Sequence, residues 1–180
     1  RVGGGRARLE GKKMEPIRVL VADDHLMVRQ GLRAMLDGVE NIEVVGEAAD
    51  GEEALEQVAR HKPDVVLMDL RMPVVNGVEA TRRLKAEFPE LAVLMLSGYD
   101  SDAVLVEAIK AGANGYILKG ASKDLLVNAI RAVHSGATLF DAALLREAVA
   151  GREEAAIGLA EEEAAGVERG ELERVFSPRQ

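Results

Sequence analysis

Five side chains that can take part in phosphate or metal chemistry stand at the ends of hydrophobic runs. They are Asp23, Asp24, Asp69, Ser97 and Lys119. Three carboxylates brought together repel one another, and this repulsion raises their pKa values unless a cation joins them. A hard divalent ion such as Mg²⁺ accepts carboxylate oxygens and usually keeps several waters. The residue types therefore predict a magnesium site with an ammonium group and a hydroxyl group beside it.

Such a site can accept a phosphoryl group. Bound metal leaves one carboxylate free to act as a nucleophile and neutralises the incoming phosphoryl charge. The lysine and the serine then supply a positive charge and a hydrogen bond to the phosphoryl oxygens. A single aspartate after a strand is commonly a turn residue or a helix cap, and Asp23 or Asp24 is also expected to cap the helix that follows. The recurrence of such residues at successive run ends favours one shared site.

The hydrophobic runs have the character of strands in a parallel sheet. Val, Ile and Leu fill them almost without polar interruption, which is typical of strands buried on both faces. The runs are residues 17–22, 42–48, 64–69, 91–96 and 115–119. Helical spacing appears between them, as in the stripe that contains Met27, Leu32 and Leu36. Together they predict a doubly wound five-stranded α/β domain, in which ligands bind at the carboxyl ends of the strands.

The composition excludes several classes of protein. The chain has 180 residues, of which 48% are hydrophobic, so it can bury a core, and it has no cysteine for a disulfide, a thiolate metal site or a nucleophile. Its longest apolar run, residues 91–96, is far shorter than the roughly 20 residues that cross a bilayer. Acidic residues outnumber basic ones 31 to 23, which argues against a nucleic-acid-binding face on the body of the protein. We expect a cytoplasmic protein without a membrane segment.

Four separated motifs resemble the receiver domain of two-component response regulators. They are VLVADDH at 19–25, VVLMDLRMPVVNG at 65–77, VLMLSG at 93–98 and GYILKG at 115–120. The resemblance covers residues 17–136 and implies a flavodoxin-like receiver fold. Many receivers have a proline after the lysine, in a cis peptide, whereas Gly120 stands here and makes a cis bond less favourable. In this respect the chain is similar to the subclass that carries LuxR-type helix-turn-helix output domains.

The resemblance implies a role for each acidic residue. Asp69 would be the phosphoacceptor that attacks a phosphohistidine of a sensor histidine kinase. Asp24 and Asp69 would bind Mg²⁺, with Asp23 acting directly or through water. The backbone carbonyl of Arg71 would be the remaining protein ligand. The chain would catalyse its own phosphorylation and dephosphorylation and no other reaction.

The resemblance also implies how the phosphorylated site is sensed. Lys119 would contact the phosphoryl group, and Ser97 would be the hydroxyl that moves to meet it. Tyr116 would be the aromatic switch that changes rotamer with Ser97. Arg71 and Tyr99, two residues past Asp69 and Ser97, are expected to tune the lifetime of the phosphate.

The ends of the chain differ from its centre. We expect residues 1–13 to be a non-native or disordered leader, 14–136 the receiver domain and 137–175 a helix-prone acidic linker. Within the linker, FDAALLREAVAG predicts a helix that ends at Gly151. The last five residues, FSPRQ at 176–180, resemble the opening of a LuxR-type helix-turn-helix domain that is otherwise missing.

Two functions remain open at this point. The first is a phosphorylation-activated switch of a transcriptional output domain, with a homodimer formed on phosphorylation and DNA bound only through the missing C-terminal domain. The alternative is a stand-alone phosphorelay or protein-interaction receiver with no DNA-binding output. Enzymes on similar folds fit less well: the adjacent Asp23 and Asp24 would repel a flavin phosphate, and a haloacid-dehalogenase-type phosphatase needs Asp-x-Asp after its first strand.

Overall fold

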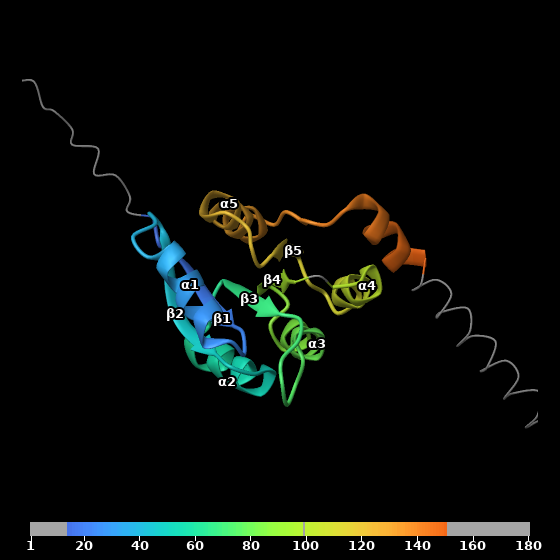
Figure 1. The fold of residues 1–180 in the computed structure, drawn as a ribbon, viewed down its shortest axis with the longest axis horizontal. Coiled ribbons are helices and arrows are strands. Elements are labelled where there is room, and N and C mark those ends of the chain that lie inside the picture. Colours follow the sequence, from blue (N-terminus) through green and yellow to red (C-terminus); the bar gives the residue numbers. More distant parts are fainter. Residues whose placement is uncertain (1–13, 99, 151–180) are drawn as a thin grey trace, which may run out of the picture.

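A five-stranded parallel sheet lies at the centre of the computed structural model, which describes residues 14–98 and 100–150 (Figure 1). The strand order is β2-β1-β3-β4-β5. The strands are β1 (Ile17–Ala22), β2 (Ile42–Ala48), β3 (Val65–Asp69), β4 (Ala92–Ser97) and β5 (Gly115–Leu118). The helices are α1 (Leu26–Leu36), α2 (Gly51–His61), α3 (Gly77–Glu87), α4 (Asp102–Lys110) and α5 (Lys123–His134). The predicted doubly wound α/β fold is confirmed.

Both faces of the sheet are covered by helices, which explains why its central strands are almost entirely apolar. Leu20 and Met68 point to the face covered by α2, α3 and α4, whereas Val21 and Leu67 point to the face covered by α1 and α5 (Figure 1). All four side chains are fully buried. Alternate residues of one strand thus enter two separate cores, which are lined mainly by apolar side chains.

The strand limits agree with the predicted runs to within one residue. The third strand begins at Val65 and the fourth ends at Ser97, one residue later in each case than the run predicted. Asp69 and Ser97 are therefore the last residues of their strands, held by the sheet itself.

The start of α1 differs from the prediction. The residue at the N-cap is His25, and no side chain caps the helix there. The carboxylate Oδ1 of Asp23 instead accepts a hydrogen bond of 2.8 Å from the backbone N–H of His25, ahead of the helix. The expectation that Asp23 or Asp24 caps this helix is therefore wrong.

The apolar stripe of α1 is also shifted. Met27 is 84% exposed and is not part of the core. Leu36 and Leu32 face the sheet, and the side chain four residues before Leu32, Val28, packs against the same core. Because helix positions four residues apart share a face, Met27 points away from it.

The loop after β3 folds back closely onto the strand end. A Cβ atom on Gly77 would lie 1.9 Å from the carbonyl oxygen of Asp69, so only glycine fits where α3 begins. The N–H of Gly77 donates a hydrogen bond of 3.0 Å to the carbonyl of Leu70. Within this loop Val74 has a φ of +68°, a conformation that β-branched residues rarely adopt.

Residues after α5 return to the sheet and cover its β5 edge. Leu139 forms a parallel bridge with Gly115: its N–H donates to the carbonyl of Asn114 at 2.9 Å, and its carbonyl accepts from Tyr116 at 3.2 Å. Residues 142–150 are helical and lie beside α4 (Figure 1). The buried side chains Leu144 and Ala148 join the core on the α2–α3–α4 face. Packing against the sheet thus continues past residue 136.

Some predictions concern residues that the structure does not describe. The leader at 1–13, the start of a helix-turn-helix domain at 176–180, and the helix end at Gly151 lie outside the described residues. No helix within 14–98 or 100–150 is long and apolar enough to cross a membrane.

Candidate functional site

The carboxyl ends of β1 and β3 bring together an acidic cluster. Ligand atoms of Asp23, Asp24, His25 and Asp69 lie within 4.8 Å of one another. Asp23 is completely buried and Asp69 is 4% exposed, whereas Asp24 and His25 face solvent. The neighbouring strands β1 and β3 end at the same edge of the sheet, so residues 46 positions apart share one site. The structure thus brings together the three aspartates singled out in the sequence.

Lys119 bridges two of these carboxylates. Its Nζ atom lies 2.9 Å from Oδ2 of Asp23 and 3.1 Å from Oδ1 of Asp69. Its backbone N–H donates a hydrogen bond of 2.9 Å to the carbonyl of Ser97, which fixes the chain as it leaves β5. The lysine therefore reaches the acidic cluster from across β4.

Burial and the neighbouring charges shift the pKa values of Asp69 and Lys119. Burial raises the pKa of the Asp69 carboxyl, and the nearby Asp23 charge raises it further, while the Lys119 ammonium partly opposes both. Burial by itself lowers the pKa of Lys119, but hydrogen bonds and attraction from Asp23 and Asp69 outweigh it, so the net pKa is raised. The lysine stays charged, and a further cation would favour the ionised form of Asp69.

Asp23 provides an independent indication that the cluster suits a cation. Its Oδ1 accepts the His25 N–H, whereas its buried Oδ2 pairs with the Lys119 ammonium at 2.9 Å. His25 places Nδ1 2.9 Å from Oδ1 of Asp24. A buried carboxylate oxygen whose one close cation is an ammonium group shared with Asp69, next to two more carboxylates, fits a hard divalent cation such as Mg²⁺.

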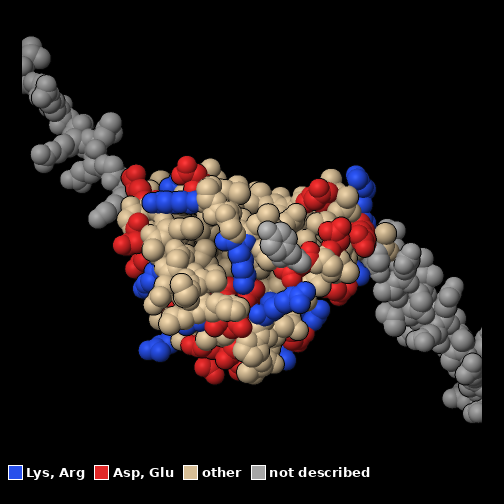
Figure 2. Space-filling model, viewed as in Figure 1, with Lys and Arg blue, Asp and Glu red and all other residues tan. Residues whose placement is uncertain are grey.

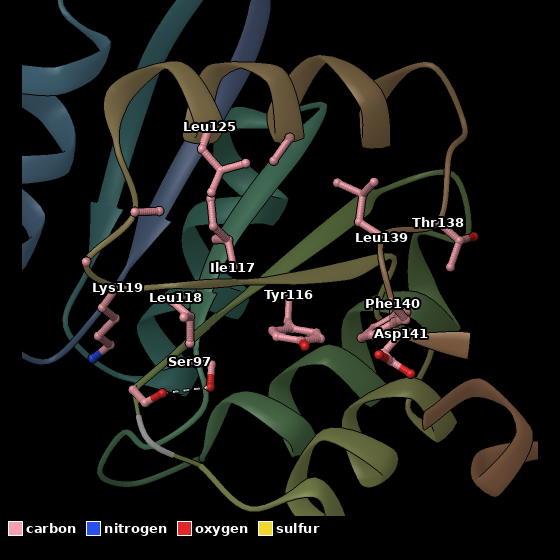
Figure 3. Close-up of a pocket in the computed structure, with 14 residues that line it drawn as sticks. Ser97, Tyr116, Ile117, Leu118, Lys119, Leu125, Thr138, Leu139, Phe140 and Asp141 are labelled. Carbon is pink, nitrogen blue, oxygen red and sulfur yellow. Dashed lines mark hydrogen bonds between the residues drawn. The ribbon is translucent and has the colours of Figure 1, made fainter. Parts of the chain in front are cut away.

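Ser97 is buried at the end of β4, and its hydroxyl is directed toward the following loop. Its Oγ lies 3.1 Å from Oδ2 of Asp100 and 3.2 Å from the carbonyl oxygen of Gly98, the second contact being drawn in Figure 3. Oδ1 of Asp100 accepts a hydrogen bond of 2.9 Å from Nε of Arg71. Asp100 was not singled out in the sequence, because it lies four residues past the predicted strand at 91–96, whereas Asp69 is the last residue of its predicted strand.

Tyr116 lies on the other side of β5 from Lys119 and contacts the segment that follows α5. Its ring centroid is 5.9 Å from that of Phe140, with the rings inclined by 36° (Figure 3). Both rings line a mainly apolar groove of about 740 Å³ that also reaches Ser97 and Lys119. Phe140 was missed because nothing in its local sequence shows that the linker returns to the sheet.

The expectations for Tyr99, for the peptide bond before Gly120 and for Arg71 have different outcomes. Tyr99 lies outside the described residues. Within the described part of the chain no peptide bond is cis, including the one that precedes Gly120. The side chain of Arg71 pairs with Asp100 and its N–H lies 3.4 Å from Oδ1 of Asp69, whereas the role of its carbonyl as a metal ligand stays a prediction.

Sheet order and site together define a class. The protein is a flavodoxin-like α/β protein with an acidic, lysine-bridged site at the carboxyl edge of its parallel sheet. Residues 19–131 match the family described as the response regulator receiver domain. The chain belongs to this family.

Similar full-length proteins are named as transcriptional or response regulators. The transcriptional regulatory protein LnrK of Bacillus subtilis is 43% identical over 120 residues, which cover 67% of this chain and 54% of LnrK. The response regulator GacA of Pseudomonas viridiflava is 45% identical over 120 residues, covering 67% of this chain and 56% of GacA. The chain thus matches just over half the length of these relatives.

Solved structures show the same fold in the same family. The signal receiver domain of NarL from Mycobacterium tuberculosis superposes with a TM-score of 0.66 and 36% identity, covering 68% of this chain and 99% of that domain. A LuxR-family two-component response regulator from Aurantimonas sp. SI85-9A1 gives a TM-score of 0.67 and 33% identity, covering 77% of this chain and 99% of that structure. The similarity extends to the subclass expected from the sequence.

Proposed function

We propose that this chain is a phosphorylation-activated switch in which Asp69 accepts a phosphoryl group from a phosphohistidine of a sensor histidine kinase. One observation carries the proposal. The carboxylate of Asp69 stands at a strand end, 3.1 Å from the Lys119 ammonium and within the cluster formed with Asp23 and Asp24. A nucleophile, a cation for the phosphoryl oxygens and a set of metal-binding carboxylates are thereby present in one place.

The transfer is a displacement at phosphorus. A carboxylate oxygen of Asp69 forms the new O–P bond as the P–N bond of the phosphohistidine breaks, and the imidazole nitrogen leaves with the electron pair of that bond. Lys119 stabilises negative charge on the phosphoryl oxygens in the transition state. Its raised pKa keeps it protonated for this role at neutral pH. Hydrolysis of the acyl phosphate returns the free carboxylate, so the chain acts on no substrate besides its own aspartate.

The same residues would hold a magnesium ion. Asp24 and Asp69 would hold Mg²⁺, with Asp23 acting directly or through water and the backbone carbonyl of Arg71 completing the protein ligands. The bound ion supplies positive charge to the carboxylate and phosphoryl oxygens. The excess of negative charge in the cluster, where Asp23 and Asp69 share the single ammonium of Lys119, supports this assignment.

Two residues would report the phosphorylated state. Ser97 would turn its hydroxyl toward the phosphoryl group, and Tyr116 would change rotamer with it, leaving its place beside Phe140. Such a change is a shift between two populations that a local charge biases. The readout would therefore reach the surface at β5 and the segment that follows α5.

The output we propose is control of transcription through a DNA-binding domain outside the described residues, with homodimer formation on phosphorylation. The transcriptional relatives support the output. On the face seen in Figure 2, described lysines and arginines are interspersed with aspartates and glutamates and form no continuous basic surface. Light scattering with and without beryllofluoride, a phosphoryl mimic, tests the homodimer: an unchanged mass contradicts it.

The phosphoacceptor is tested directly by incubating the chain with a small acyl phosphate and Mg²⁺ and measuring intact mass. We expect a gain of one phosphoryl group that hydroxylamine removes, and no gain in Asp69→Asn. Asp37→Asn is the control, because Asp37 is exposed at the end of α1 and outside the acidic cluster. Phosphorylation that persists in Asp69→Asn, or that fails in the parent chain, contradicts the proposal.

A further inference from the structure

Asp100 is a nearly buried acidic residue that lies beside the acidic site without belonging to it. It precedes α4 and its side chain is only 7% exposed. The Asp100 carboxylate accepts hydrogen bonds from the Gly98 N–H at 2.9 Å, from the Ser97 hydroxyl at 3.1 Å and from Nε of Arg71 at 2.9 Å. Hydrogen bonds to a carboxylate are among the stronger ones in proteins, especially with a charged donor.

Two of these three donors are groups that a phosphoryl group on Asp69 would attract. Ser97 ends the strand beside β3, next to Asp69, and Arg71 is two residues past Asp69 with its N–H directed toward the same carboxylate. A serine hydroxyl has one proton to donate. Ser97 therefore cannot donate to Asp100 and to a phosphoryl oxygen at the same time.

We infer that Asp100 is a positioning residue that holds the Ser97 hydroxyl and the Arg71 side chain in the unphosphorylated arrangement, in competition with the phosphoryl group on Asp69. The inference rests on the function proposed above. Before phosphorylation, the Asp100 carboxylate is the anion that takes both donors. A phosphoryl group introduces a second anion, and the hydroxyl and the guanidinium redistribute between the two.

Asp100 would thereby set how far the unphosphorylated protein favours its inactive arrangement. A ligand shifts a two-state equilibrium only by its difference in affinity for the two states. Each hydrogen bond that must be broken on activation subtracts from the affinity for a phosphoryl mimic. Removing the Asp100 carboxylate should remove that cost and release Arg71 to neutralise the mimic.

The test is the affinity of the full chain for beryllofluoride in the presence of Mg²⁺, measured by titration. We expect Asp100→Ala to bind the mimic about tenfold more tightly than the parent chain, the effect of losing one hydrogen bond to a charged group. Asp100→Asn keeps an acceptor oxygen but loses the charge, so its affinity should fall between the two. Asp102→Asn is the matched control, because Asp102 is exposed on the same loop-to-helix connection and should leave the affinity unchanged.

A combination with Ser97→Ala separates positioning from a general loosening of the loop. In the Ser97→Ala background, Asp100→Ala should give a clearly smaller gain in affinity, because the competition for the hydroxyl no longer exists. A gain of the same size in both backgrounds, or unchanged or weaker binding in both Asp100 variants, overturns the inference. If the parent chain binds no beryllofluoride at all, the proposed phosphorylation itself fails, which is a distinguishable result.

Discussion

At the scale of single residues, the site holds more negative charge than its one lysine neutralises. Asp23 and Asp69 are both nearly or fully buried and share one ammonium group, that of Lys119. Burial and mutual repulsion favour the protonated form of Asp69. Buried charged groups can often be replaced by well-packed apolar residues without loss of stability. Their presence here therefore indicates that the charges serve the function of the site.

This arrangement predicts a pH-dependent gain of stability in Asp69→Asn. The pKa of Asp69 is raised in the folded chain above its ordinary value of 3.8, so the folded state binds more protons between the two values. The free energy of unfolding of the parent therefore falls as pH rises through this window, and the penalty is complete above it. In the absence of Mg²⁺ we expect Asp69→Asn to be more stable at pH 7 by about 0.5–2 kcal/mol.

Urea denaturation at several pH values measures this difference. The advantage of Asp69→Asn should shrink as pH falls toward 3.8, because the parent carboxyl is then protonated in the folded state. Addition of Mg²⁺ at pH 7 should stabilise the parent and reduce the difference, since the ion binds only the folded site. A variant less stable than the parent at neutral pH would contradict the electrostatic reading.

Val74 provides a second residue-scale prediction, in a loop whose backbone restrains the site. Its φ of +68° places a β-branched residue in the left-handed region, and its side chain is 81% exposed, so little packing compensates for the strain. We expect Val74→Asn to raise the free energy of unfolding by about 1 kcal/mol. Val74→Ile keeps the branched Cβ and should give no gain. Thermal unfolding of the parent, Val74→Asn and Val74→Ile measures this difference. Equal melting temperatures would argue against strain at this position.

Much of the site could be predicted at the residue level from a single rule. The carboxyl ends of parallel strands share an edge, so Asp23, Asp69 and Lys119 were expected to meet, and they do. The rule says nothing about hydrogen bonds inside a loop, which is why the pairing of Asp100 with Arg71 was not foreseen. It also could not distinguish an aspartate that caps a helix from one, such as Asp23, that holds the turn before it.

At the scale of elements, the segment after α5 behaves as an addition to the sheet. Through residue 139 it bridges β5, the last strand in the sheet order, and residues 142–150 then lie beside α4 (Figure 1). An uncovered edge strand is prone to pair with other chains. The returning segment occupies part of that edge and places Phe140 against Tyr116.

Gly115 makes this close approach possible, and its replacement is the element-scale prediction. A Cβ at position 115 would lie 2.7 Å from Cβ of Leu139, which leaves no room for the bridge. We expect Gly115→Ala to lower the free energy of unfolding by about 1–3 kcal/mol, as overpacking does. Gly31→Ala is the control: it lies within α1 with nothing near its Cβ position, and it should be stabilising by about 0.5–1 kcal/mol. Urea denaturation that ranks the two variants in the opposite order would contradict this packing.

The elements themselves were predictable to very different degrees. Each strand was found to within a residue because its aliphatic run is bounded by polar or turn residues, as at Asp69. The helix at 142–150 was expected from its composition, but the surface against which it packs was not. Which surface it covers depends on Leu144 and Ala148 meeting side chains of α4 and the sheet, and that is a tertiary contact without a local signature.

At the scale of the whole molecule, the site and the returning segment lie on opposite sides of β5 and are connected through it. Lys119 contacts the acidic cluster, and Tyr116, three residues earlier, contacts Phe140 (Figure 3). A change of rotamer at Tyr116 would remove an aromatic contact worth about 0.5–1.5 kcal/mol. The segment from residue 139 to residue 148 would then be held less firmly.

Hydrogen exchange can detect this coupling. On addition of beryllofluoride and Mg²⁺, we expect the backbone amides of Tyr116 and Leu139, which join β5 to the returning segment, to exchange about threefold to tenfold faster, as the loss of one aromatic contact implies. Phe140→Leu should show faster exchange at both amides without the mimic, while the amide of Val66 in the central strand β3 should be unaffected. Unchanged exchange at Leu139 in the loaded protein would show that the segment does not respond to the site.

The position of Lys119 has a consequence for the synthesis of the protein. The strands join the sheet on the β5 side in the order in which they leave the ribosome, β3, then β4, then β5, so the ammonium that completes the site is added last. A partly made or partly folded chain can contain Asp23 and Asp69 next to each other, yet it lacks their shared counterion. If Asp69 is the phosphoacceptor as proposed, we expect a chain without its final strand to accept no phosphoryl group, so that an incomplete regulator would not be switched on.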